Sequence, residues 1–184
     1  MPHQILTSAK SAMLKEYKDH VEERLQQGIP PLPLNAEQVA DLVELLKSPP
    51  AGEEEFILDL IKNRTPAGVD PAAYVKAAFL TALAKGETSS PLIDKKLATE
   101  LLGTMLGGYN VESLIKLLKD EEVGAIAADG LSKTLLMFNA KHEVIELAAE
   151  NENAKRVVES WSNGEWFTSR SKLPEVIKAV VFRV

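Results

Sequence analysis

The chain has 184 residues, 45% hydrophobic and 26% charged, which is enough to bury the core of one globular domain without a disulfide or a metal. It contains no cysteine, which excludes disulfides, thiolate zinc sites and cysteine-held iron–sulfur clusters from this chain. The net charge of -6 argues against a duplex-binding surface, because affinity for nucleic acid depends on clustered Lys and Arg. No stretch is suited to span a bilayer and the first residues lack a secretory pattern, so we expect a cytoplasmic chain without membrane contact.

The first half of the sequence predicts four helices. The first covers residues 9–27 with an apolar stripe of Leu14, Tyr17, Val21 and Leu25, and the proline-rich segment 29–34 follows as an extended surface connector. Asn35 with Gln38 predicts a capping box for the second helix, and Glu53 to Glu55 form the acidic first turn of the third. Asp70 and Pro71 begin the fourth, which runs to Lys85 and whose face includes Tyr74, Ala77, Ala78, Phe79 and Leu83.

The second half continues the helical pattern almost to the end. Asp94 caps a helix that ends near Met105, Asn110 caps a short one through Leu118, and Asp120 caps one from Glu121 to about Met137. Residues 141–150 and 153–162 also have helical spacing. The tail IKAVVFRV, residues 177–184, is instead rich in β-branched residues, which predicts an extended or β segment.

This succession predicts an all-α fold. Helix starts fall into pairs at Ala36 and Glu53, Pro71 and Lys95, and Val111 and Glu121, with roughly 35 to 40 residues per pair. That interval is close to the repeat length of HEAT-like or armadillo-like solenoids, so we expect stacked helical hairpins.

The stretch LLGTMLGGYN, residues 101–110, raises the question of a phosphate-binding loop. A loop of the NTPase type needs Lys and a hydroxyl after its last glycine, and here Tyr109 and Asn110 occupy those positions. We therefore interpret Gly107, Gly108 and Asn110 as a structural turn. Gly107 is expected to end one helix in a left-handed conformation, and Asn110 to cap the next by accepting from its free amides.

No constellation of residues predicts catalysis. His20 has Glu16 one turn away and His142 has Glu146, but two ligands do not make a zinc site, and His3 stands alone. A hydrolase nucleophile elbow is also missing. The aromatic group Trp161, Trp166 and Phe167 is the one concentration of large anchors, and two interpretations stay open for it: core packing or a partner surface.

Several stretches resemble the N-terminal HEAT-like domain of the aconitate hydratase B family. They are YKDHVEER, the block from LVELLKSPPAGEEEF through GVDPAAYVKA to AKGE, SPLIDKKLATELLGTMLGGYN, LSKTLLMF and SWSNGEWF, in order and with matching intervals. The resemblance covers residues 13–184. It implies a HEAT-like helical domain at 13–170 and a tail at 171–184 that leads to a linker and catalytic domains. Residues 1–12 are either an added segment before the original Met13 or a genuine extension.

The resemblance implies that this chain is not itself an enzyme. In the family, a longer catalytic body holds a four-iron four-sulfur cluster through cysteines and interconverts citrate and isocitrate. For the HEAT-like domain it implies protein–protein contact, dimerisation and docking on that body, in cis or in trans. The alternatives are a stand-alone HEAT-like adaptor or an RNA-binding regulatory module using Lys116, Lys119, Lys155 and Arg156.

Overall fold

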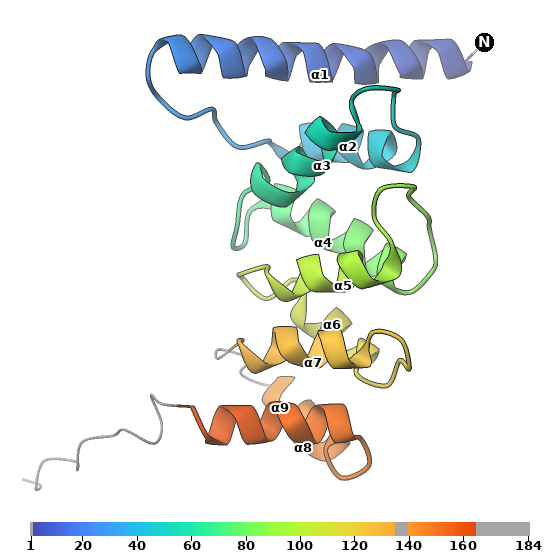
Figure 1. Cartoon of the computed structure of the whole chain (residues 1–184), viewed down its shortest axis with the longest axis vertical. Coiled ribbons are helices and arrows are strands. Elements are labelled where there is room, and N and C mark those ends of the chain that lie inside the picture. The colour runs from blue at the N-terminus through green and yellow to red at the C-terminus, as the bar shows by residue number, and fades with distance from the viewer. Residues whose placement is uncertain (1, 135–139, 165–184) are drawn as a thin grey trace, which may run out of the picture.

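The computed structural model describes residues 2–134 and 140–164, with side chains from residue 12 onward, and in these ranges all regular structure is helical (Figure 1). The predicted all-α class is confirmed for this part of the chain. The helices are α1 (Pro2–Gln26), α2 (Ala36–Lys47), α3 (Glu54–Asn63), α4 (Pro71–Ala84), α5 (Lys95–Gly103), α6 (Val111–Leu117), α7 (Gly124–Ser132), α8 (Ala140–Leu147) and α9 (Glu152–Ser162). The extended or β segment predicted at 177–184 lies outside the described residues.

Three of the predicted helix starts are confirmed by their capping hydrogen bonds. The Asn35 side chain accepts from the Gln38 amide at 2.9 Å while the Gln38 side chain accepts from the Asn35 amide at 3.0 Å, which is the reciprocal capping box. Asp70 accepts from the Ala72 amide at 2.8 Å and is followed by Pro71 in the first turn. Asp94 accepts from the Leu97 amide at 2.7 Å.

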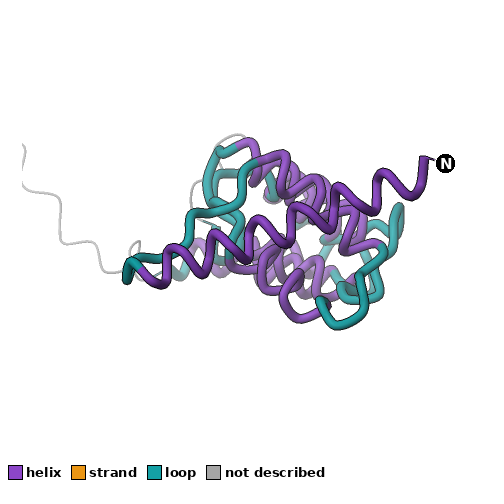
Figure 2. The backbone as a smooth tube through the Cα atoms, turned by 90° about the horizontal axis from the view of Figure 1, so that it is seen from above, coloured by secondary structure: helices purple, strands orange, loops and turns teal. Residues whose placement is uncertain are grey.

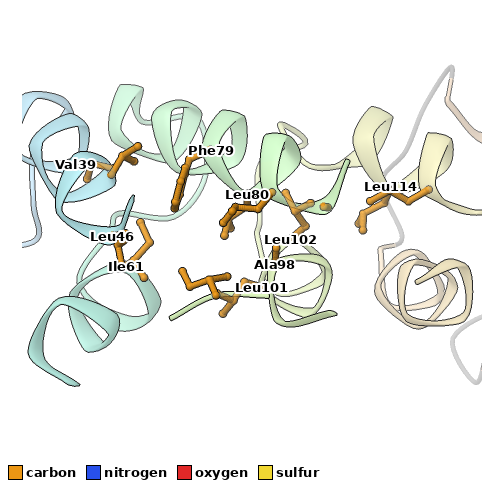
Figure 3. Packing of buried hydrophobic residues seen from close by; sticks show 14 of the residues in the cluster. Val39, Leu46, Ile61, Phe79, Leu80, Ala98, Leu101, Leu102 and Leu114 are labelled. Atoms are coloured by element: carbon orange, nitrogen blue, oxygen red, sulfur yellow. The ribbon is translucent and has the colours of Figure 1, made fainter. Parts of the chain in front are cut away.

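The helices form an elongated stack in which each element packs mainly on its neighbours (Figure 1). α2 contacts α1, α3 and α4; α5 contacts α4, α6 and α7; and α9 contacts α7 and α8. Buried leucines, alanines and Phe79 from successive helices meet in one continuous core along the stack (Figure 3). Such nearest-neighbour packing is what a solenoid requires, and the HEAT-like repeat stays a prediction.

α1 lies across one end of the stack and reaches beyond it, as the view from above shows (Figure 2). It begins at Pro2, seven residues before the expected start, and buries Met13, Leu14 and Tyr17. The connector that follows is held to α1 at Leu32. The Tyr17 hydroxyl donates to the Leu32 carbonyl at 2.7 Å, and the Leu32 amide donates to His20 Nε2 at 3.0 Å. His20 therefore has a structural role that its spacing to Glu16 did not reveal.

Two expected boundaries are wrong. α5 ends at Gly103, not near Met105. The helix predicted from Glu121 to about Met137 begins at Gly124 and ends at Ser132. Asp120 does accept hydrogen bonds, from the Glu122 and Val123 amides at 2.9 and 3.1 Å, but these close the turn that precedes α7.

α5 and α7 approach each other at a pair of glycines. A Cβ built on Gly103 would lie 3.0 Å from the Gly130 Cα, and one built on Gly130 would lie 2.7 Å from the Gly103 Cα. Gly103, the first glycine of LLGTMLGG, thus serves close helix packing, since no side chain fits between the two backbones.

Gly130→Ala is expected to lower the free energy of unfolding by about 2 kcal/mol, because the new methyl group must push two packed backbones apart. Urea denaturation followed by circular dichroism measures this loss. An unchanged midpoint would contradict the close crossing of α5 and α7.

The loops alternate between two edges of the stack (Figure 1). The loops 27–35, 64–70 and 104–110 lie on one edge, together with the end of α9. The loops 48–53, 85–94, 118–123 and 148–151 lie on the opposite edge. The loop that contains GGYN therefore lies beside the loop that precedes α4, although about 40 residues separate them in the sequence.

Candidate interaction surface

The loops 64–70 and 104–110 touch through a second pair of glycines. Gly68 and Gly107 have φ values of +80° and +95°, in the region that favours glycine. A Cβ on Gly107 would lie 2.3 Å from the Gly68 carbonyl carbon and oxygen. The expected left-handed conformation of Gly107 is confirmed, but its expected role is wrong: α5 already ends at Gly103 with Thr104 as its cap. Gly107 permits contact between two loops.

Asn110 also differs from its expected role. It precedes α6, but its side chain makes no capping hydrogen bond to that helix. Its Nδ2 instead donates to the Leu102 carbonyl at 2.6 Å and the Met105 carbonyl at 3.3 Å, so it closes the end of α5. The residue is 1% exposed, and its Oδ1 has no partner among the described residues. A buried amide donor therefore ties this loop to the helix before it.

Asn110→Ala is expected to lower the free energy of unfolding by about 2 kcal/mol, because two carbonyls at the end of α5 lose a buried donor. Asn110→Asp should lower the free energy of unfolding further, since a carboxylate has no proton to donate and would repel the same two carbonyl oxygens. The order of the two urea midpoints is the measurement. An aspartate variant as stable as wild type would show that Nδ2 is not the atom that faces these carbonyls.

An exposed apolar group lies on these two loops and on the first turn of α4. The rings of Tyr74 and Tyr109 meet edge to face with centroids 5.4 Å apart, and the Tyr109 hydroxyl donates to the Val69 carbonyl at 3.1 Å. Val69 is 74% exposed, Leu106 68%, Tyr74 60% and Tyr109 37%. We call Val69, Tyr74, Leu106 and Tyr109 the tyrosine cluster.

The sequence analysis missed this cluster. It placed Tyr74 on the buried face of its helix, and the structure shows that assignment to be wrong: Ala72, Ala73 and Lys76 are buried there instead. The available signal was Tyr109 in the uncharged, glycine-rich loop 104–110, together with Tyr74 in the first turn of the helix that follows the loop 64–70. Its meaning depended on knowing that these loops are neighbours in space.

A groove of about 1240 Å³ runs beside the cluster, between the loop 104–110 and α7. Its apolar lining includes Met105, Val111 and Ile126, and its charged lining includes Glu100, Glu112 and Asp129 against Lys133. The three carboxylates would repel a phosphate, which argues against a phosphate-binding loop. The residues before Gly103 are helical, as expected, and not the β-strand that a dinucleotide-binding loop needs. LLGTMLGGYN is a packed loop between helices in this structure.

Of the three aromatic residues Trp161, Trp166 and Phe167, the structure describes Trp161. Trp161 is half-buried against the core, and its Nε1 donates to the Leu131 carbonyl at 3.0 Å, so it anchors α9 to α7. Trp166 and Phe167 lie outside the described residues. For Trp161 these contacts favour the core interpretation over the partner surface.

The four basic residues considered for RNA each face a carboxylate. Lys116 pairs with Glu112 and Lys119 with Glu150, Lys155 lies 3.6 Å from Glu152, and Arg156 lies 3.1 Å from Asp129. Phosphate binding would have to displace these acidic partners, so this arrangement does not favour an RNA interface.

The histidines do not come together. His142 is exposed on α8, His20 holds the connector, and the side chain of His3 is not among those described. Among the described side chains, in residues 12–134 and 140–164, no group of three or more His, Asp or Glu could hold a metal ion. In the same part of the chain, no helix has the length and apolar character needed to cross a bilayer.

The described residues thus define an all-α domain with a close glycine-mediated contact between two loops and an exposed apolar surface. A family model described as the aconitate B N-terminal domain matches residues 16–167. The chain is 60% identical over 173 residues to aconitate hydratase B of Pseudomonas aeruginosa, 58% over 173 residues to that of Escherichia coli and 53% over 174 residues to that of Synechocystis. Each match covers 94% of this chain and 20% of the relative. The chain belongs to the aconitate hydratase B family and corresponds to its N-terminal domain.

Proposed function

We propose that this chain is a non-catalytic protein–protein interaction domain of an aconitate hydratase B, which acts in the cytoplasm. It docks on the catalytic portion of the enzyme, in cis or in trans, and supports dimerisation. The observation that carries the proposal is the tyrosine cluster. Exposed aromatic and aliphatic side chains held on tightly packed loops are typical of protein–protein contact.

The chemistry of the family is assigned to the catalytic portion. The interconversion of citrate and isocitrate depends in the family on a four-iron four-sulfur cluster held by cysteines. The residues of this chain do not fit such a cluster, since the sequence has no cysteine and the described part has no group of three acidic or histidine ligands. No step of the reaction is therefore assigned to these residues.

Light scattering on the purified chain, alone and mixed with a separately expressed catalytic portion of an aconitate hydratase B, tests the proposal. We expect a mass above 20.1 kDa for the chain at high concentration and a heavier complex in the mixture. A chain that stays monomeric and does not bind the catalytic portion would contradict both docking and dimerisation.

A further inference from the structure

The large hydrophobic side chains exposed in the described part of the chain are not scattered. They are Leu25, Ile29, Leu32, Val69, Tyr74, Leu106, Tyr109 and Ile145. All except Ile145 lie on, or within four residues of, the loops 27–35, 64–70 and 104–110. We call these seven residues the apolar edge. It contains the tyrosine cluster and extends it toward α1.

The three loops form a continuous strip because each contacts the next. The Leu34 amide donates to the Arg64 carbonyl at 2.8 Å, which joins the first loop to the second. The Gly68–Gly107 contact and the Tyr109–Val69 hydrogen bond join the second to the third. Figures 1 and 2 both place these loops on the same side of the stack.

The charges differ between the two edges. The loops of the apolar edge contain only two charged residues, Arg64 and Asp70. The loops 48–53, 85–94, 118–123 and 148–151 on the opposite edge are predominantly acidic: Glu53, Lys85, Glu87, Asp94, Lys119, Asp120, Glu121, Glu122 and Glu150. An interface core is typically depleted of charge, so the charge pattern favours the apolar edge over the opposite edge as an interface.

The position at which α9 ends indicates what covers the apolar edge. α9 ends at Ser162, and Figure 1 shows this end of the helix on the side of the stack where the apolar edge lies. The relatives are about five times longer than the matched segment, and the matched segment is their N-terminal domain. The chain thus leaves its described part on this side of the domain, and the tether raises the effective concentration of the polypeptide that follows.

We propose that the apolar edge is the face on which this domain docks against the polypeptide that follows it in aconitate hydratase B. This inference rests on the proposed function and identifies the surface through which the domain docks. The partner surface is apolar and carries few charges, because the edge offers few charges to pair with and the Tyr109 hydroxyl is already used by Val69. The acidic opposite edge faces solvent in the assembled enzyme.

Hydroxyl-radical footprinting of two samples tests the inference. One is the isolated chain, and the other is a full-length enzyme in which residues 1–164 precede the corresponding continuation of the Pseudomonas aeruginosa aconitate hydratase B. Oxidation of Leu106 and Tyr109 is expected to fall by more than about threefold in the full-length enzyme, because side chains at an interface core lose water. Ile145, which lies off the edge, should keep its rate.

A pair of matched variants refines the test. Leu106→Asp, at an exposed loop position, should restore oxidation of Tyr74 and Tyr109 in the full-length enzyme toward the rate in the isolated chain. Ile145→Asp should leave their protection unchanged. The aligned positions of the intact Pseudomonas aeruginosa enzyme provide a second measurement that does not depend on the fusion, and they should be protected in the same pattern.

The outcomes separate the inference from the proposed function. Protection confined to other surfaces, such as the acidic loops, would contradict the apolar edge and leave docking intact. No protection anywhere would contradict docking itself. Protection of the edge in the isolated chain that rises with its concentration would mean that a second copy covers it, which also contradicts the inference.

Discussion

Gly107→Ala is expected to lower the free energy of unfolding by more than about 3 kcal/mol, because two costs combine at this position. Alanine is strained at a φ of +95°, and its methyl group would overlap the Gly68 backbone, with a carbonyl carbon and oxygen at 2.3 Å. The loops 64–70 and 104–110 would have to separate. Urea denaturation followed by circular dichroism measures the loss.

Gly108 provides a matched control one residue away. Its φ is +96°, almost the same, but a Cβ there would meet nothing within 4 Å. Gly108→Ala should therefore lower the free energy of unfolding by about 1 kcal/mol, which is the cost of backbone strain alone. Equal losses for the two variants would show that strain alone matters and would contradict the contact between the loops.

Lys76→Met is expected to stabilise the protein at pH 7. Lys76 is 6% exposed on α4, and its Nζ donates to the Lys62 carbonyl at 3.4 Å. Burial lowers the pKa of Lys76 to about 8. Holding the charged form in the fold thus costs up to about 3 kcal/mol, and methionine keeps the apolar stem without the charge.

The sign of the pH dependence follows from this shift. The unfolded chain binds a proton at Lys76 up to its ordinary pKa near 10.5, while the folded chain releases it near 8. The wild type should therefore gain stability from this group as pH rises from 8 to 10.5, and the advantage of Lys76→Met should shrink over the same window. Urea midpoints of both proteins at pH 7 and pH 10 measure this difference.

Lys96, which is exposed on α5, provides the control. Lys96→Met should show no comparable change in its difference from wild type between the two pH values. A constant advantage of Lys76→Met across the same range would contradict a buried cationic lysine in the fold.

The sequence predicted the helices well where their ends are determined locally. Asn35 with Gln38, Asp70 with Pro71 and Asp94 mark helix starts through hydrogen bonds to residues two or three positions away, and such short-range chemistry is visible in one sequence. Asp120 shows the limit of this reasoning. Its carboxylate accepts hydrogen bonds from two backbone amides, as a helix cap would. These bonds close a turn, however, and α7 begins at Gly124, three residues later than expected.

The candidate surface was not predictable in the same way, because it depends on contacts between distant segments. Asn110 looked like a cap for α6, yet its donors reach the carbonyls of Leu102 and Met105. Tyr74 had helical spacing with apolar neighbours, yet its ring meets Tyr109 on the surface. The Tyr74–Tyr109 pair depends on the packing of the loop 64–70 against the loop 104–110, whereas the Asn110 hydrogen bonds depend on how its own loop returns to the end of α5.

The central claim is that this chain works with the catalytic portion of an aconitate hydratase B. Immunoprecipitation from source cells with an antibody raised against residues 13–164, followed by mass spectrometry, tests it most directly. The account predicts peptides of that catalytic portion in the precipitate, either from the same polypeptide or from a bound one. A precipitate that contains this chain without any catalytic portion would contradict the account.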